Sequence, residues 1–143
     1  MNAPLRRSVT VACDVEHAFE TFTARIDLWW PPSHKAEGAH LVLEPGVGGR
    51  FVAKQGDGGE KLFGEIVRWE PPHRLTYTWY PGALTEPTEV DVQFLADGDA
   101  TVVEIVHAEA AAAMGDQWPE RVALFERGWG LVLPAFADYV RSR

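Results

Sequence analysis

The last stretch of the chain, residues 119–143, constrains the fold most, because its pattern predicts a long amphipathic helix. Its large apolar residues recur at steps of three and four, which places their side chains on one face of an α-helix. These residues are Val122, Phe125, Trp129, Val132, Phe136 and Val140. Gly128, Gly130 and Pro134 would cost an isolated helix about 5 kcal/mol relative to alanine. The rest of the chain must therefore pack against this helix to stabilise it.

Pro134 also predicts where the helix bends. A proline ring clashes with the carbonyl group four residues earlier, which here belongs to Gly130. We expect a kink over residues 130–134, just beyond Trp129. A space would then open at that point between the helix and the elements that cover it.

Length and charge narrow the class of protein. The chain has 143 residues, 46% of them hydrophobic, so we expect residues 1–143 to form one domain. The formal net charge is −8 and the 13 Lys and Arg residues are scattered, which disfavours nucleic acid and anionic membranes as partners. No apolar run approaches the roughly 20 residues of a membrane span. The N-terminus leads into no apolar segment, so we expect a cytoplasmic protein.

The residues before this helix predict one strand, two short helices and then a run of strands. We expect a strand at 8–13, a helix at 15–22 capped by Asp14, and a second short helix capped by Asp27. Gly, Pro or Asp-Gly signals bound six further candidate strands. They lie at 39–44, 50–54, 62–70, 74–80, 88–96 and 100–108. Sequential strands with tight turns favour an antiparallel meander, and the C-terminal helix is long enough to cover its concave face.

Alternation within the strands predicts which side chains face the helix. The bulkier set in the strand 62–70 is Phe63, Glu65, Val67 and Trp69, and in the strand 74–80 it is Leu75, Tyr77 and Trp79. The strand 100–108 leaves two orientations open. Either Val103, Ile105 and His107 face inward, or Val102, Glu104 and Val106 do. Trp29 and Trp30 would point about 100° apart on a helix. We therefore expect one of these two to pack and the other to gate a pocket or lie on the surface.

Five segments, in their order along the chain, resemble one family. They are Trp29-Trp30-Pro31, LEPGVGGRF at 43–51, GEIVRWEPPHRLTYTW at 64–79, TEVDVQF at 88–94 and ERGWGLVLPAFADYV at 126–140. The sequence resembles homologues of the activator of the ninety-kilodalton heat-shock chaperone ATPase, in the START-like (SRPBCC) superfamily. This resemblance implies an α+β helix-grip fold: a curved antiparallel sheet around a long C-terminal helix, with two short N-terminal helices. Val47 and Pro134 depart from the family pattern, and Pro134 would reshape the space beneath the kink.

The resemblance also implies a cavity between sheet and helix, since superfamily members enclose one for lipids, polyketides, sterols, hormones or toxins. Large aromatic residues are suited to line such a cavity, although they would equally fill it as a core. The candidate ligand-pocket residues are Trp30, Phe51, Phe63, Glu65, Trp69, Tyr77, Trp79, His107, Phe125, Trp129 and Leu133.

Two polar candidates could carry chemistry in that cavity. His107 would donate to a ligand oxygen at the cavity mouth, or it would be an ordinary core or rim residue. Glu65 would have a raised pKa if it were buried without a cationic partner, or it would stay in water near a strand end. His34, His40 and Glu37 fit no common metal spacing. We expect no metal, no cofactor and no catalytic residue.

Three classes of function remain. The first is binding of a small hydrophobic ligand, lipids included, without catalysis. The second is a partner-binding domain related to the chaperone activators, with a part in the stress response, although we expect no residues here for the activator's additional N-terminal chaperone-binding domain. The third is a cyclase- or hydrolase-like enzyme using His107 and Glu65, which is less favoured than binding. Exposed sheet edges would also allow a homodimer.

Overall fold

A computed structural model describes residues 3–35, 37–79, 88–109 and 117–142. The helices and strands run in the order β1 (Leu5–Val11), α1 (Val15–Thr23), α2 (Ile26–Trp29), a 3-10 turn (Pro32–His34), β2 (His40–Leu43), β3 (Arg50–Lys54), β4 (Glu60–Glu70), β5 (Arg74–Trp79), β6 (Thr88–Asp97), β7 (Ala100–Glu109) and α3 (Gln117–Arg141). The predicted elements are all present, with ends that differ by a few residues. The predicted ends at Tyr80 and Arg143 lie outside the described residues.

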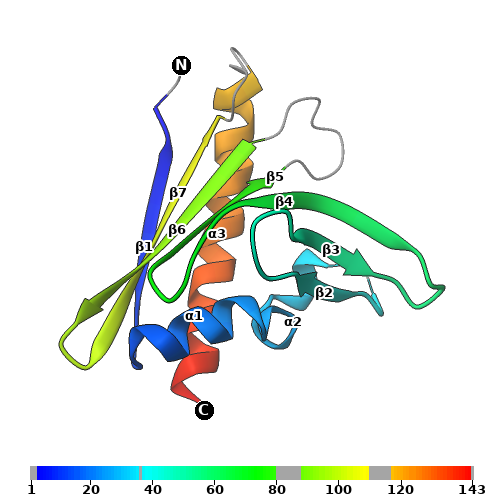
Figure 1. Ribbon diagram of the computed structural model, residues 1–143. Helices are drawn as coiled ribbons and strands as arrows, with labels where there is room; N and C mark the ends of the chain where they lie inside the picture. The colour runs from blue at the N-terminus through cyan, green and yellow to red at the C-terminus, as the bar shows by residue number, and fades with distance from the viewer. Residues whose placement is uncertain (1–2, 36, 80–87, 110–116, 143) are drawn as a thin grey trace.

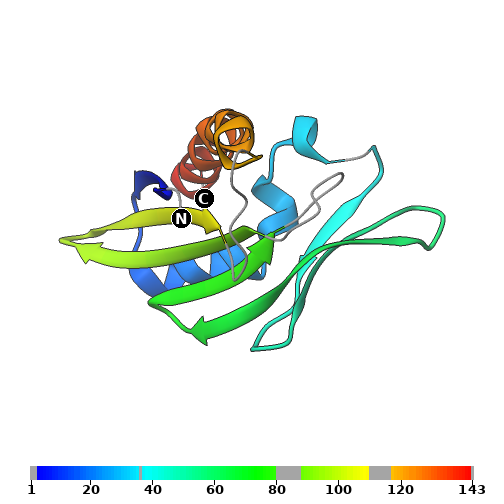
Figure 2. The same ribbon diagram turned by 90° about the horizontal axis from the view of Figure 1, so that it is seen from above.

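The seven strands pair into one antiparallel sheet in the order β1-β7-β6-β5-β4-β3-β2. From β2 to β7, each strand pairs with the next along the chain, and β1 pairs with β7 at the other end. Figures 1 and 2 show this sheet curving around α3. The predicted helix-grip fold is therefore confirmed. None of the helices in the described ranges is long and apolar enough to cross a lipid bilayer.

Helix α3 buries the predicted face, and its turns beyond the proline are closely packed. It continues unbroken through Pro134, which lies on the exposed side, so the lost backbone hydrogen bond faces solvent. Beyond that point Phe136 and Val140 are 0% and 4% exposed. The ring of Phe136 lies 5.4 Å from that of Phe22 in α1 and 4.8 Å from that of Trp29 in α2. Val132 lines one of the cavities described below, which agrees with a space beside residues 130–134, whereas α1 and α2 pack against the turn beyond Pro134 (Figure 1).

The predicted inner face of β4 is only partly right, because register shifts interrupt its alternation. Between β4 and β5 the pairing passes from Ile66 to Arg68, which leaves Val67 as an extra residue. A bulge of this kind turns the following side chains over. An earlier shift in the pairing of β4 with β3 leaves Phe63 as an extra residue, so Ile66 is fully buried and Glu65 is exposed. After the shift at Val67, Trp69 returns to the inner face.

Trp29 and Trp30 are both buried, 4% and 7% exposed, which contradicts the prediction that only one would pack. Helix α2 ends at Trp29, and Trp30 already has extended dihedral angles, φ −61° and ψ 132°. The 100° rotation between helical neighbours therefore does not apply to this pair. The Trp29 indole donates a hydrogen bond to the Thr21 carbonyl oxygen, and the Trp30 indole donates to that of His34.

Asp27 joins α2 to β2 instead of capping the helix. Its Oδ1 accepts hydrogen bonds from Lys35 Nζ and from the Leu41 backbone N–H, both at 2.8 Å. Its Oδ2 lies 2.9 Å from His40 Nδ1. Burial raises the pKa of Asp27, but the hydrogen bonds from Lys35, His40 and Leu41 outweigh it and lower this pKa to about 2. Asp14, by contrast, caps α1 as predicted, because its Oδ1 accepts from the His17 backbone N–H at 2.9 Å.

We predict that Asp27→Asn lowers the free energy of unfolding at pH 6 by about 1 kcal/mol, a value discounted for solvent screening. A carboxylate whose folded pKa lies below its unfolded value of about 3.9 stabilises the fold above that pH. This contribution is lost as the pH falls from about 4 to about 2. Urea unfolding of wild type and variant should therefore differ at pH 6 and converge near pH 2. Glu37→Gln, at an exposed site, is the control and should match wild type; a constant difference for Asp27→Asn would contradict the assignment.

Candidate functional site

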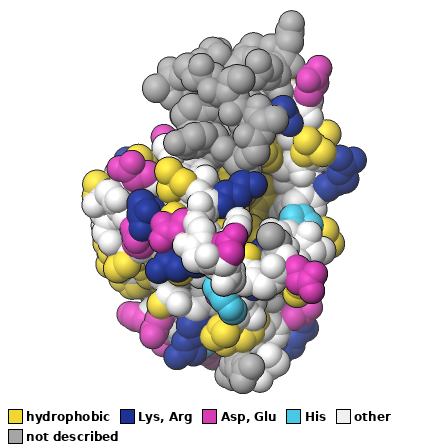
Figure 3. Space-filling view, turned by 90° about the vertical axis from the view of Figure 1, so that its right-hand side faces the viewer, with side chains coloured by type: hydrophobic (Ala, Val, Ile, Leu, Met, Phe, Trp, Pro, Cys, Tyr) yellow, Lys and Arg dark blue, Asp and Glu magenta, His cyan; other side chains and the backbone are white. Residues whose placement is uncertain are grey.

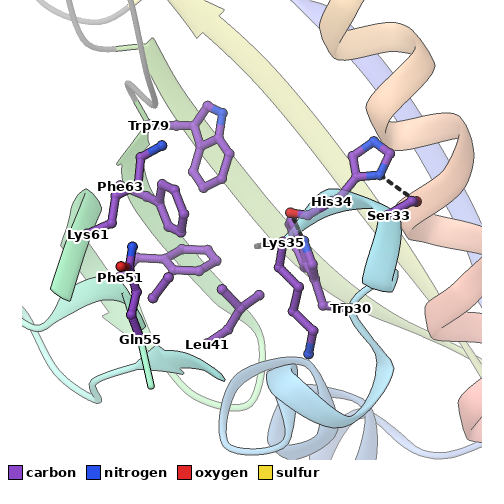
Figure 4. Close-up of a pocket in the computed structure, with 11 residues that line it drawn as sticks. Trp30, Ser33, His34, Lys35, Leu41, Phe51, Gln55, Lys61, Phe63 and Trp79 are labelled. Carbon is purple, nitrogen blue, oxygen red and sulfur yellow. Dashed lines mark hydrogen bonds between the residues drawn. The ribbon is translucent and has the colours of Figure 1, made fainter. Parts of the chain in front are cut away.

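Two adjoining cavities lie between the sheet and the helices. The strand-side cavity measures about 410 Å³ and is lined by Trp30, Ser33, His34, Lys35, Leu41, Phe51, Ala53, Gln55, Lys61, Phe63 and Trp79 (Figure 4). The helix-side cavity measures about 200 Å³ and is lined by Trp30, His34, Tyr77, Trp79, His107, Leu124, Phe125, Gly128, Trp129 and Val132. Both include Trp30, His34 and Trp79, so these residues stand between them.

Aromatic rings from several elements form the wall of the strand-side cavity. The ring of Trp79, on β5, lies 5.4 Å from that of Phe51 on β3 and 5.2 Å from that of Phe63 on β4. Trp30 faces Trp79 across the boundary between the cavities, with ring centroids 6.4 Å apart. Figure 4 shows these rings turned toward one another from opposite sides of the cavity. Rings in this arrangement offer flat apolar surfaces to a flat apolar ligand.

Phe63 reaches this wall because the backbone of β4 is irregular there. The pairing with β3 passes from Phe51–Gly64 to Val52–Leu62, which leaves Phe63 as an extra residue. The next residue, Gly64, lies so close to β5 that a Cβ atom would stand 1.7 Å from the Thr78 carbonyl oxygen. Only glycine fits at that position, so the bulge and the glycine together place the Phe63 ring beside Trp79.

A chain of hydrogen bonds runs through the buried wall of the helix-side cavity. Trp129 Nε1 of α3 donates to His107 Nδ1 at 3.1 Å, and His107 Nε2 lies 2.8 Å from Thr88 Oγ1. The Thr88 hydroxyl in turn donates to the Trp79 carbonyl oxygen. Since the Thr88 proton is used in that bond, its oxygen accepts from His107, which fixes the proton of His107 on Nε2. We call Trp129, His107, Thr88 and Trp79 the cross-cavity chain.

His107 is held neutral within this chain. It is 1% exposed and its ring stacks on that of Phe125 at 4.1 Å. Burial lowers the pKa of His107 to about 3. Because both ring nitrogens already have partners, His107 has no free nitrogen to donate to a ligand or to accept a proton at neutral pH. The prediction that it donates to a ligand oxygen is not supported by this geometry.

Tyr77 also lines the helix-side cavity, and it is 1% exposed. Burial raises the pKa of the Tyr77 hydroxyl, so it keeps its proton at any physiological pH. This hydroxyl makes no hydrogen bond with another residue in the described ranges. Tyr77 therefore brings to a mainly aromatic cavity a polar group that has no hydrogen-bond partner among the described residues.

The charged residues at the strand-side cavity are basic, although the protein as a whole is acidic. Lys35 forms an ion pair with Asp27, whereas the Lys61 ammonium lies 5.7 Å from the centroid of the Phe63 ring. No Asp or Glu is among the described residues that line either cavity. Figure 3 shows the face that carries β2–β4, where charged side chains of both signs surround a hollow with hydrophobic side chains visible inside.

Most of the predicted pocket residues lie around these cavities. Those that line one or both are Trp30, Phe51, Phe63, Tyr77, Trp79, His107, Phe125 and Trp129. Glu65, Trp69 and Leu133 do not. Glu65 is exposed, the Trp69 ring packs on Phe19 at 5.1 Å, and Leu133 is buried in the core. Reading β4 as a regular strand wrongly turns Glu65 inward, whereas Trp69 does face inward but packs on α1.

The sequence reasoning missed polar residues that line the strand-side cavity. Gln55 and Lys61 flank the turn between β3 and β4, and Lys35 follows the 3-10 turn. Nothing in their spacing identifies them, because they converge only after the sheet has curved. His34, weighed as a metal candidate, lines both cavities with its Nδ1 3.0 Å from Ser33 Oγ, while His40 pairs with Asp27. Among the described residues no cluster of His, Cys, Asp and Glu has the arrangement of a metal site.

Comparison with known proteins identifies the family. The family described as "Activator of Hsp90 ATPase homolog 1-like protein" matches residues 12–141, nearly the whole chain. The chain belongs to this family. The predicted resemblance to chaperone-activator homologues of the START-like superfamily is thus confirmed. A search of curated proteins finds no match.

Solved structures similar to this family member include proteins of different function. One is an anthrahydroquino-gamma-pyrone synthase complexed with SUM, 39% identical over 96% of each chain, with a TM-score of 0.65. Another is CalC from Micromonospora echinospora, described as a self-sacrificing resistance protein. It is 28% identical, and the match covers 98% of this chain and 95% of CalC with a TM-score of 0.75. A protein from Rhodobacter sphaeroides, 21% identical with a TM-score of 0.70, shares the fold over 99% of this chain and 94% of its own.

We predict that His107 makes the stability of this family member fall steeply below pH 6.5. The unfolded state binds a proton there and the folded state does not, so the free energy of unfolding drops by about 1.4 kcal/mol per pH unit down to about pH 3. Urea unfolding should show His107→Gln to be less stable than wild type at pH 7 but flatter between pH 6 and pH 4. His73→Gln, at an exposed site, should keep the wild-type slope. Equal slopes for wild type and His107→Gln would show that His107 takes up a proton in the folded state.

Proposed function

We propose that this protein binds a small, planar hydrophobic molecule across the two cavities without converting it. The observation that carries this proposal is the pair of adjoining cavities, about 410 and 200 Å³, whose shared boundary is formed by Trp30, His34 and Trp79. Ligand cavities of small molecules commonly measure 300–1,000 Å³ and are largely apolar with few polar groups. A flat fused-ring ligand fits this wall better than a flexible chain, because it loses less conformational freedom on binding.

The similarity to the synthase supports a fused-ring ligand. That relative, 39% identical, is described as acting in the formation of an anthrahydroquino-gamma-pyrone. CalC, the resistance protein, shares the same fold. A ligand of the fused-ring aromatic class is therefore our first choice over a fatty acid or other lipid.

Catalysis on such a ligand is the second candidate, and the similarity to a synthase is the observation that favours it. Such catalysis would not use Glu65 and His107, the two residues predicted for it. Glu65 is in solvent, and both ring nitrogens of His107 are engaged. Lipid binding, a part in the stress response, a chaperone contact, a homodimer and a cytoplasmic location remain predictions from the sequence.

We predict saturable binding of 9-fluorenone, a flat three-ring ketone, with a dissociation constant in the micromolar range, about −8 kcal/mol. Tryptophan fluorescence and equilibrium dialysis would both report it. Trp79→Ala should weaken binding about 10-fold through the loss of ring contact. Trp69→Ala is the matched control, because Trp69 packs against Phe19 outside both cavities.

Two outcomes would contradict the proposal. Absence of binding to folded wild type would mean that the rings only fill a core, and it would favour the partner-binding class. Chromatography of fused-ring aromatic ketones incubated with the protein is the second test. A new product that needs folded wild-type protein would move the assignment to the enzyme class.

A further inference from the structure

We propose that the ligand carries an oxygen acceptor on its ring system, as an aryl ketone or quinone does, and that the Tyr77 hydroxyl donates a hydrogen bond to it. This inference rests on the proposed function and names the chemistry of the same site. It makes Tyr77 a specificity-determining residue. The sequence pattern had placed Tyr77 in the wall only as an aromatic ring.

The first observation is that the Tyr77 hydroxyl lacks a hydrogen-bond partner among the described residues. Tyr77 is 1% exposed and lines the helix-side cavity, and none of the hydrogen bonds among the described residues includes its hydroxyl. A buried hydroxyl without a partner costs free energy, so native proteins seldom leave one unused. The ring is held in place by Phe51 and Trp79, with centroid distances of 5.4 and 6.3 Å. The hydroxyl is therefore fixed in position before a ligand arrives.

The second observation is that three other polar rings of the cavity walls, those of Trp30, Trp129 and His107, are occupied. Trp30 Nε1 donates to the His34 carbonyl oxygen, and Trp129 Nε1 donates to His107 Nδ1. The bond from Trp129 uses the lone pair of His107 Nδ1, and His107 Nε2 bonds the Thr88 hydroxyl. No ring nitrogen of His107 is thus left to accept a hydrogen bond from a ligand.

Two groups on the helix-side wall are donors. The Trp79 indole N–H, like the Tyr77 hydroxyl, makes no hydrogen bond with any residue in the described parts of the chain. Two such donors, beside a His107 acceptor that is already taken, favour an oxygen acceptor on the ligand. A site built to hydrogen-bond one ligand group discriminates against an analogue that lacks the group, because the protein group is then left unpaired.

The experiment compares two flat ligands of the same shape, 9-fluorenone and fluorene, which differ by one carbonyl oxygen. Dissociation constants are measured by equilibrium dialysis for wild type and for Tyr77→Phe, which removes only the hydroxyl. The preference for fluorenone should fall about 3- to 10-fold in Tyr77→Phe, through weaker fluorenone binding with fluorene binding unchanged. Tyr139→Phe, which removes a hydroxyl from a residue outside both cavities, should keep the wild-type preference.

Infrared spectroscopy gives a readout that a merely structural role for Tyr77 would not move. The carbonyl stretch of bound fluorenone should lie at lower wavenumber in wild type than in Tyr77→Phe. An unchanged preference together with an unchanged carbonyl stretch would overturn this inference and leave the proposed function standing, since both ligands still bind. Failure of fluorene and fluorenone alike to bind folded wild type would overturn the proposed function itself.

Discussion

The cross-cavity chain is the constraint on which the site depends. It connects α3 through Trp129 to β7 at His107, then to Thr88 at the start of β6 and to the backbone of β5 at Trp79. Trp129, His107 and Thr88 are buried and Trp79 is half-buried, so each polar group would lose free energy if its partner moved away. The chain therefore sets the distance between helix and sheet on one side of the helix-side cavity. On the other side, toward the C-terminal end of α3, packing of α1 and α2 on Phe136 closes the core.

This division explains why the cavities lie beside the N-terminal half of α3. Glycine and small or half-buried residues face the sheet there, including Gly128 and Phe125, whereas the following turns bury Val132, Phe136 and Val140. The far end of the sheet contributes the second part of the site. Its strands β3 and β4 curve away from the helix, and the bulge at Phe63 turns an aromatic ring into the space so formed. Curvature that separates a sheet from its helix creates volume only where side chains do not fill it.

Patterns with a fixed period predicted much of this protein correctly. The apolar stripe of α3, the capped helix α1 and the meander all follow from spacing within single elements. Predictions failed where the backbone leaves its regular period. The extra residue at Phe63 turned Glu65 into solvent, and the end of α2 at Trp29 let two neighbouring tryptophans pack together. The ring of Pro134 lies on the solvent side of the helix, while Val132 on the opposite side lines the helix-side cavity. Gln55 and Lys61 could not be found from spacing, since tertiary curvature alone brings them to the cavity.

Binding and catalysis are closely related outcomes for a site of this kind. With His107 neutral and fully bonded, this residue offers no base to a ligand, and the described wall supplies orientation and hydrogen-bond donors. Orientation by itself accelerates a reaction between two groups of one ligand, because it removes the entropy of bringing them together. A flat site with a fixed donor would therefore bind a stable aromatic ketone unchanged and would assist closure of a ring in a reactive one. A synthase and a resistance protein share this fold, which agrees with the general rule that function follows the ligand and the site more than the fold. Under the proposed function, the reactivity of the ligand then decides between binding and catalysis.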